Sequence, residues 1–129
     1  MYKRQLKKVN ENAYKELRFS TNLEEAVKDA DLVIETIAEI PDEKVEFYKN
    51  LAPYLKEDAI LVTNSSTLLP STFKDYTGRE EKYLSLHFAN DIHRQNIAEI
   101  MRHDTTSLSL IHISEPTRRE WLSRMPSSA

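Results

Sequence analysis

The sequence of 129 residues contains no cysteine and only one glycine, Gly78. Since about 7% of residues in proteins are glycine, a chain of this length would carry roughly nine. One glycine excludes the motifs built on several: the dinucleotide-binding fingerprint, the phosphate-binding loop and the nucleophile elbow. Either the function needs none of these motifs, or the segment that holds them is not in this sequence. The lack of cysteine fits a reducing compartment.

Long apolar runs are also absent, and the longest, such as Leu32-Val33-Ile34, are too short for a transmembrane helix. The start of the chain is polar and does not read as a signal peptide. With 40% hydrophobic and 30% charged residues, the composition is typical of a soluble globular domain. The net charge is -3, and basic residues cluster only at Lys3, Arg4, Lys7 and Lys8. We therefore expect a cytoplasmic protein that binds neither nucleic acid nor membrane.

Helical and strand patterns alternate along the chain and predict an α/β fold. A capping box at Thr21–Glu24 opens a short helix, and a second helix begins at Pro41. Residues 32–37 are nearly continuously apolar, which is typical of a parallel strand buried on both faces. We predict helices at residues 1–15, after Thr21, from Pro41 and at residues 70–76, and Gly78 ends the last of these. We predict strands at residues 17–20, 32–37, 59–63, 83–88 and 97–101.

The last 22 residues do not follow this pattern. Their sequence, beginning Leu108-Ser109-Leu110-Ile111-His112, resembles the translation of a DNA-sequencing adapter. We therefore expect residues 108–129 to be a non-native, disordered tail and residues 1–107 to be the biological domain, shortened at both ends. His112 and Trp121 are then excluded from any functional site.

Polar side chains follow the predicted parallel strands, at the edge where ligands bind in such sheets. They are Glu39, Asn64, Ser65, Ser66, His87 and Asn90. We expect them to line one crevice, although they lie far apart in the sequence.

His87 and Glu99 form a candidate acid-base dyad. Glu99 lies in an apolar strand, where a buried carboxylate needs a partner. If the two strands are neighbours, Glu99 can hold the His87 imidazole in one tautomer. The alternative is a core histidine with a structural partner, and the residue pattern alone leaves both open.

Two further constellations are weaker. Asp91, His93 and His103 could join His87 in a metal site, but their spacing matches no common ligand pattern, so we expect no metal. Ser66, His87 and Glu99 could form a hydrolase triad, but no glycine flanks the serine.

Four ordered blocks resemble the 3-hydroxyacyl-CoA dehydrogenase family, over roughly residues 10–104. They are Asp31-Leu32-Val33-Ile34-Glu35, Asn64-Ser65-Ser66-Thr67-Leu68, Leu86-His87-Phe88-Ala89-Asn90 and Ala98-Glu99-Ile100-Met101. The 3-hydroxybutyryl-CoA dehydrogenases are the most similar branch. The resemblance implies a partial NAD-binding domain at 1–107, with a Rossmann-like, doubly wound, mostly parallel sheet that lacks its first βαβ unit.

The resemblance also implies an activity: NAD-dependent interconversion of 3-hydroxyacyl-CoA and 3-oxoacyl-CoA, in fatty acid or butyrate metabolism. In the family, a histidine removes the proton of the substrate hydroxyl, and a glutamate orients that histidine. These two residues correspond to His87 and Glu99. The remaining implied residues are Ser66 and Asn90 for substrate and cofactor, and Glu39 and Lys44 for cofactor.

Two departures from the family matter. Asp91 stands where many members have proline, and the glycine-rich turn is absent, as is the C-terminal helical domain that closes over the acyl chain and makes the homodimer. We therefore expect the 129-residue chain to be inactive and to bind NAD poorly. The alternatives are a non-catalytic α/β fragment or binding module, and a related sugar-acid dehydrogenase.

Overall fold

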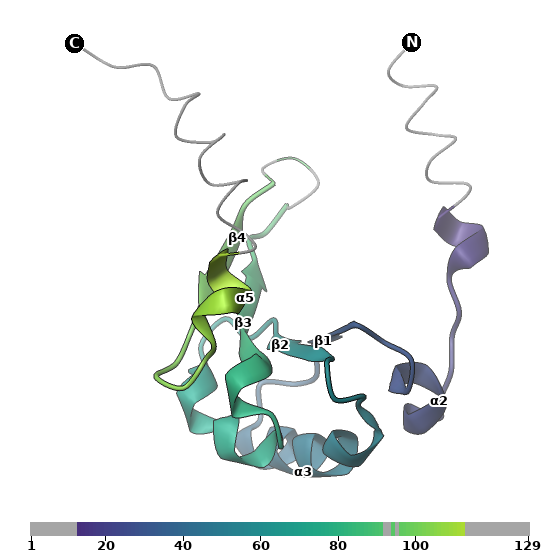
Figure 1. The fold of residues 1–129 in the computed structure, drawn as a ribbon. Coiled ribbons are helices and arrows are strands. Elements are labelled where there is room, and N and C mark those ends of the chain that lie inside the picture. Colours follow the sequence, from purple (N-terminus) through teal and green to yellow (C-terminus); the bar gives the residue numbers. More distant parts are fainter. Residues whose placement is uncertain (1–12, 92–93, 95, 113–129) are drawn as a thin grey trace.

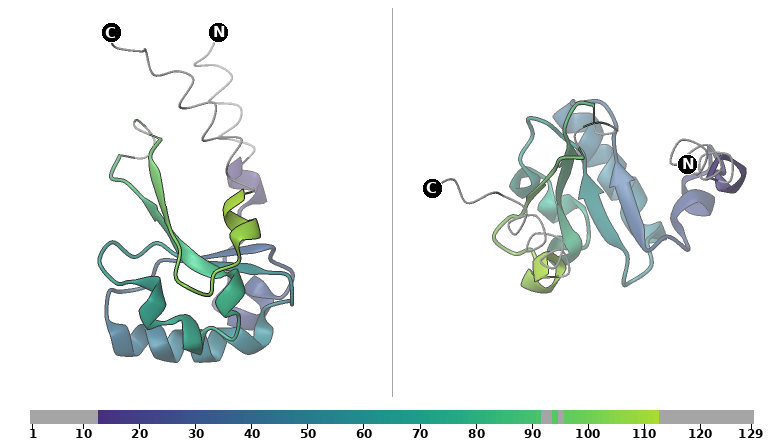
Figure 2. Two further views of the ribbon diagram at one scale, coloured as in Figure 1. Left: turned by 60° about the vertical axis from the view of Figure 1, so that its left-hand side comes forward. Right: turned by 90° about the horizontal axis from the view of Figure 1, so that it is seen from above.

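The chain forms a four-stranded sheet in the order β1-β2-β3-β4 (Figure 1), seen from two further sides in Figure 2. The computed structural model describes residues 13–91, 94 and 96–112. β1 pairs with β2 and β2 with β3 in parallel, whereas β3 and β4 are antiparallel. The α/β class with a mostly parallel sheet is therefore confirmed. The strands are β1 (Leu32–Glu35), β2 (Ile60–Thr63), β3 (Tyr83–Phe88) and β4 (Ala98–Met101). The α-helices include α2 (Leu23–Val27), α3 (Pro41–Leu51) and α5 (Leu108–His112).

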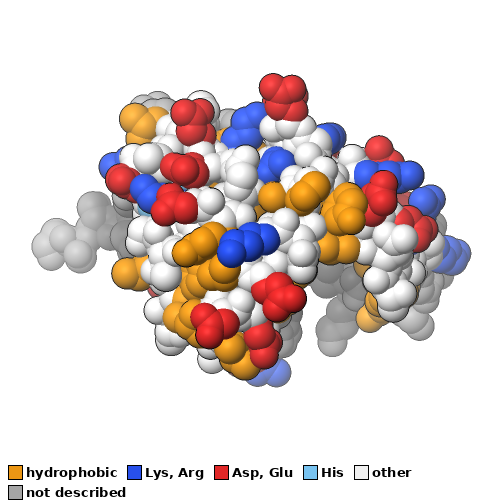
Figure 3. All heavy atoms as spheres, turned by 90° about the horizontal axis from the view of Figure 1, so that it is seen from below, with side chains coloured by type: hydrophobic (Ala, Val, Ile, Leu, Met, Phe, Trp, Pro, Cys, Tyr) orange, Lys and Arg blue, Asp and Glu red, His pale blue; other side chains and the backbone are white. Residues whose placement is uncertain are grey.

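The core lies between the sheet and α3, which crosses beneath it (Figure 1). Pro41 begins α3 as the sequence predicts, and Tyr48 and Leu51 point inward one turn apart. The Tyr48 and Tyr83 rings meet edge to face, with centroids 5.5 Å apart, which joins α3 to β3. The buried cluster comprises Val27, Tyr48, Leu51, Leu55, Ala59, Leu61, Phe73 and Tyr83. Seen from below, the side of the molecule that α3 forms carries acidic and basic side chains among scattered hydrophobic ones (Figure 3).

β1 differs from the prediction of a strand buried on both faces. Val33 and Glu35 face α3, but Leu32 and Ile34 point to the opposite side and are exposed. The reason is that β1 is an edge strand among the described residues and no described element covers its second face. The run of apolar residues therefore marks a surface that the described part of the chain leaves open.

The segment before α2 also differs from its prediction. Residues 17–20 form no strand, since no described strand lies beside them, and Phe19 is 94% exposed. The helix cap is Asn22 rather than Thr21: the Asn22 side chain accepts a hydrogen bond from the Glu25 amide. Residues 13–16 are helical, and the rest of the helix predicted at 1–15 lies outside the described residues.

The segment between β2 and β3 contains three 3₁₀ turns, η2 (Pro70–Thr72), η3 (Lys74–Tyr76) and η4 (Glu80–Lys82). Gly78 follows η3 with φ of +65°, the left-handed conformation predicted for it. After β4 the chain forms α5, so residues 108–112 of the predicted disordered tail are helical. Residues 113–129, the rest of that predicted tail, lie outside the described residues. None of the described helices is long and apolar enough to cross a membrane.

Candidate active site

His87 and Glu99 lie directly opposite each other on the antiparallel strands β3 and β4. The distance from His87 Nδ1 to Glu99 Oε2 is 3.2 Å. Because residues opposed on one face of such a pair have side chains in contact, the strand register itself builds the dyad. The expectation of a buried Glu99 is wrong: its side chain is 71% exposed, since β4 is exposed along its whole length. Glu99 is thus a partner in a solvated setting.

Ser66 lies on the other side of the imidazole. It follows β2, and its Oγ is 3.3 Å from His87 Nε2. A carboxylate only accepts hydrogen bonds, so the proton of a neutral His87 belongs on Nδ1, facing Glu99. The Nε2 lone pair then faces Ser66 and the carboxyl edge of the sheet, where it can accept a proton.

Asn64 ties the end of β2 to the end of β3. The ladder between these strands stops at Thr63 and Ser85, and beyond it Asn64 Oδ1 accepts a hydrogen bond of 2.9 Å from the Phe88 amide. The Asn64 side chain therefore takes the place of a backbone carbonyl one step past the ladder. This hydrogen bond holds the β3 backbone next to His87, at the point where the segment after β2 leaves the sheet and leads to Ser66.

Glu39 lies in the segment between β1 and α3. Its Oε2 accepts hydrogen bonds from the Ser65 hydroxyl at 2.6 Å and the Thr67 hydroxyl at 3.1 Å. Partial burial acts to raise the pKa of Glu39, but these hydrogen bonds and the positive charge of Lys44 outweigh it and hold the pKa below its usual value. Glu39 is therefore an ionised carboxylate fixed at the carboxyl edge of β2.

A buried polar network behind Glu39 was not predicted from the sequence. Glu35 Oε1 accepts hydrogen bonds from Lys44 Nζ at 2.8 Å and the Ile37 amide at 2.7 Å, and its Oε2 accepts from Tyr48 at 2.6 Å and Thr63 at 2.8 Å. All four donors satisfy one carboxylate, as a buried charge requires. The signal for this network was present in the sequence, because Lys44 falls on the inner stripe of α3, one turn before Tyr48.

The tyrosines of this network are strongly perturbed. The hydroxyls of Tyr48 and Tyr83 are 3.0 Å apart. Burial, with the neighbouring Glu35 carboxylate, raises the pKa of Tyr83 to about 12, and burial raises the pKa of Tyr48 further still. Both hydroxyls therefore stay protonated and act as donors or acceptors only.

Asn90 and Asp91 form the turn after β3. Asn90 is exposed, and its side chain makes no hydrogen bond to another described residue. Asp91 has φ of +57°, in the left-handed region. Proline is locked near -65°, so the turn has a shape that the proline of many family members could not adopt.

The residues considered for a metal site are not gathered into one. No group of three or more histidine or carboxylate side chains in the described ranges could hold a metal ion. His103 is buried against the Tyr83 ring, and its Nδ1 contacts the Thr105 hydroxyl at 3.1 Å. His93 lies outside the described residues.

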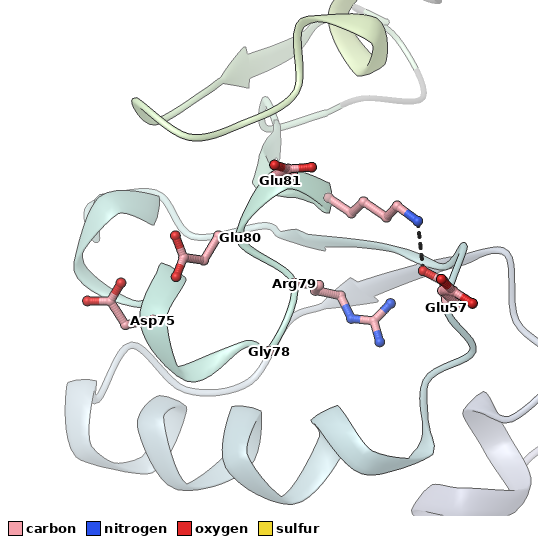
Figure 4. Close-up of a pocket in the computed structure, with 7 residues that line it drawn as sticks. Glu57, Asp75, Gly78, Arg79, Glu80 and Glu81 are labelled. Carbon is pink, nitrogen blue, oxygen red and sulfur yellow. Dashed lines mark hydrogen bonds between the residues drawn. The ribbon is translucent and has the colours of Figure 1, made fainter.

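A cavity of about 570 Å³ lies at the opposite end of β3 (Figure 4). It is lined by Glu57, Asp75, Gly78, Arg79, Glu80, Glu81 and Lys82. The Arg79 guanidinium donates to the carbonyls of Leu55, Lys56 and Ala59, so its role is to close the end of the preceding helical segment. This cavity shares no residue with the dyad, and we assign it no chemistry.

The arrangement at the carboxyl edge suits proton transfer beside a polar ligand. His87 can accept a proton at Nε2, Glu99 can stabilise the resulting imidazolium, and Ser66 adds a dipole next to the same nitrogen. These side chains lie at the carboxyl edge of the parallel strands, where ligands bind in sheets of this kind. The single glycine, Gly78, lies at the other edge, so the chain holds no glycine-rich cradle for a pyrophosphate.

Known proteins are similar to this chain in sequence and in fold. Residues 2–121 match the family model described as 3-hydroxyacyl-CoA dehydrogenase, NAD binding domain. The fatty acid oxidation complex subunit alpha of Idiomarina loihiensis is 36% identical over 87 residues, which cover 67% of this chain and 12% of that protein.

Two solved structures are also similar. A diketoreductase, described as a dual catalyst of dicarbonyl compounds, is 43% identical with a TM-score of 0.78, covering 81% of this chain and 38% of that one. An (S)-3-hydroxybutyryl-CoA dehydrogenase from Ralstonia eutropha is 25% identical with a TM-score of 0.68, covering 78% and 35%. The chain thus spans well under half the length of each of these proteins.

Proposed function

The chain belongs to the 3-hydroxyacyl-CoA dehydrogenase family, as a match to its NAD-binding domain, and we propose that it carries the acid-base half of that chemistry within a longer dehydrogenase. The reaction is the interconversion of 3-hydroxyacyl-CoA and 3-oxoacyl-CoA, in fatty acid or butyrate metabolism. The observation that supports this most is His87 held between Glu99 and Ser66, at 3.2 and 3.3 Å. A hydrolase would use the same three groups with Ser66 as the nucleophile, but family membership favours the dehydrogenase.

The proposed roles follow from the contacts. NAD, when bound, supplies or accepts the hydride. In the oxidation, His87 Nε2 takes the proton of the 3-hydroxyl, and in the reduction it returns that proton to the forming hydroxyl. Glu99 fixes the tautomer through Nδ1 and stabilises the imidazolium. The Ser66 hydroxyl, already beside Nε2, hydrogen-bonds the same substrate oxygen.

For the cofactor we propose Glu39, Ser66 and Asn90 as residues that contact its nicotinamide half, and Lys44 as a residue that acts on it through the contact with Glu39. The 129-residue chain by itself should bind NAD weakly and turn over no substrate, because it has no glycine-rich turn for the pyrophosphate. Calorimetric titration of NAD into the purified chain tests this. Tight binding would show that the pyrophosphate is held in another way.

The test of the activity uses the full-length protein that contains residues 13–107. Purified protein is mixed with 3-hydroxybutyryl-CoA and NAD, and NADH formation is followed by its absorbance. We expect turnover in the parent and in Lys74→Gln, which removes an exposed ion pair with Asp104 outside the site. In His87→Gln we expect turnover to be lower by about 10² to 10⁴. Absence of turnover with 3-hydroxyacyl-CoA substrates of every chain length would overturn the proposed reaction.

A second candidate substrate class is supported by one comparison. Over the aligned residues, the chain is 43% identical to the diketoreductase and 25% identical to the hydroxybutyryl-CoA dehydrogenase. The same dyad can protonate the oxygen of a dicarbonyl compound that carries no CoA. Comparing kcat/KM for acetoacetyl-CoA and for a diketo ester in the same protein separates the two, since a preference for the ester would favour dicarbonyl reduction.

A further inference from the structure

The two oxygens of Glu35 have different neighbours. Oε2 is bound by Tyr48 of α3 and Thr63 of β2, which anchor the carboxylate to the core. Oε1 is bound by the Ile37 amide and by Lys44, which flank the segment that carries Glu39. One oxygen thus holds Glu35 in place, and the other holds the segment between β1 and α3.

Lys44 continues this connection toward the surface. Its side chain is only 1% exposed, so its amine cannot meet a ligand from solvent as the described residues stand. That amine lies 2.8 Å from Glu35 Oε1 and 3.4 Å from Glu39 Oε1. The Glu39 side chain is 41% exposed. Lys44 therefore affects the exposed edge of the sheet only indirectly, through its contact with the Glu39 carboxylate.

The buried pair is not explained by stability alone. Taking two charges out of water costs free energy that their attraction often fails to recover, and well-packed apolar residues can replace such pairs at no loss. Here, however, the pair contacts an exposed carboxylate at the edge of the sheet where the cofactor is proposed to bind. A hydrophobic pair could not orient that carboxylate.

We propose that Glu35 is a positioning residue of the cofactor site, which fixes Lys44 and the Ile37 amide and so sets the position of the Glu39 carboxylate. This inference rests on the proposed function for the contact between Glu39 and the cofactor. It does not depend on which substrate the enzyme takes. Lys44 likewise acts on the cofactor through Glu39.

The test compares two variants of the full-length protein that both damage the same network. Glu35→Gln removes the charge that holds Lys44. Tyr48→Phe removes one donor from Oε2 but leaves both contacts of Oε1, and it is the matched control. NADH affinity is measured by fluorescence titration without substrate, KM for NAD and kcat by steady-state assay, and stability by urea unfolding.

We expect Glu35→Gln to weaken NADH binding and raise KM for NAD by about tenfold, the loss of roughly one hydrogen bond to a charged group, with little change in kcat. Tyr48→Phe should lose stability but keep its NADH affinity. A purely structural role predicts instead that affinity follows stability in both variants, and that result would overturn the proposal.

Two further outcomes are informative. If Glu35→Gln unfolds, the double variant Glu35→Gln/Lys44→Met, which removes both charges, takes its place in the comparison. If that variant binds NADH as tightly as the parent, neither Glu35 nor Lys44 is needed to position Glu39, and the proposal is overturned. Failure of the parent protein to bind NADH overturns the proposed function, and this inference with it.

Discussion

His87 and Glu99 are opposed residues of an antiparallel strand pair, with Nδ1 and Oε2 3.2 Å apart. The register of β3 and β4 therefore sets their distance, and no loop conformation is needed to bring them together. The parallel ladder between β2 and β3 brings Ser66 to the other nitrogen of the same ring. A proton acceptor held from both sides in this way is pre-organised for the chemistry we propose.

Replacing Glu99 with glutamine should lower kcat about tenfold, because an amide can also donate and no longer fixes the proton on Nδ1. The effect is modest because Glu99 is mostly exposed, and solvent can replace part of its role. Steady-state kinetics of the full-length protein measure it. An unchanged kcat with an intact fold would show that the Glu99 contact orients nothing.

Replacing Asn64 with alanine should remove the hydrogen bond to the Phe88 amide. We expect a loss of about 1 kcal/mol in the free energy of unfolding, and faster hydrogen exchange of that amide. Asn64→Asp keeps an acceptor at the same place and should retain most of the protection. If both variants exchange at the parent's rate, another group must hold the end of β3.

Alkaline pH should unfold the domain through its buried tyrosines. The pKa of Tyr83 is raised to about 12 from its ordinary value of 10.0, so the folded state holds a proton that the unfolded state releases. This contribution to stability is complete below about pH 10 and is lost as the pH rises toward 12. Unfolding by urea at several alkaline pH values measures the loss. Tyr48→Phe should lessen the dependence, and a flat stability over this range would contradict it.

The sheet could be predicted from the sequence because it follows from short-range patterns. The dyad was predicted from the family resemblance, since the residue pattern alone left a structural histidine open. The apolar strands and the helix beginning at Pro41 have clear periodicity, and His87 and Glu99 lie on consecutive strands. Burial was harder to predict. We expected Glu99 to be the buried carboxylate and residues 32–37 to be covered on both faces. In the structure Glu35 is the buried carboxylate, while Leu32, Ile34 and Glu99 are exposed.

These errors share a physical cause. A strand's sequence indicates that its side chains prefer to be buried, but which face is covered depends on the elements packed against it. Lys44 carried the relevant signal, since a lysine on the inner stripe of α3 requires a buried negative partner. That partner comes from β1, nine residues earlier, and its identity follows only from the packing of α3 on the sheet.

The central claim is that His87 is the acid-base group of a dehydrogenase. The most direct measurement is kcat of His87→Gln in the full-length protein with 3-hydroxybutyryl-CoA and NAD, with unfolding by urea as the control for folding. We predict that kcat falls by about 10² to 10⁴, the usual contribution of a general base, while stability and NADH affinity stay near those of the parent. Turnover close to the parent's in a folded variant would contradict the account.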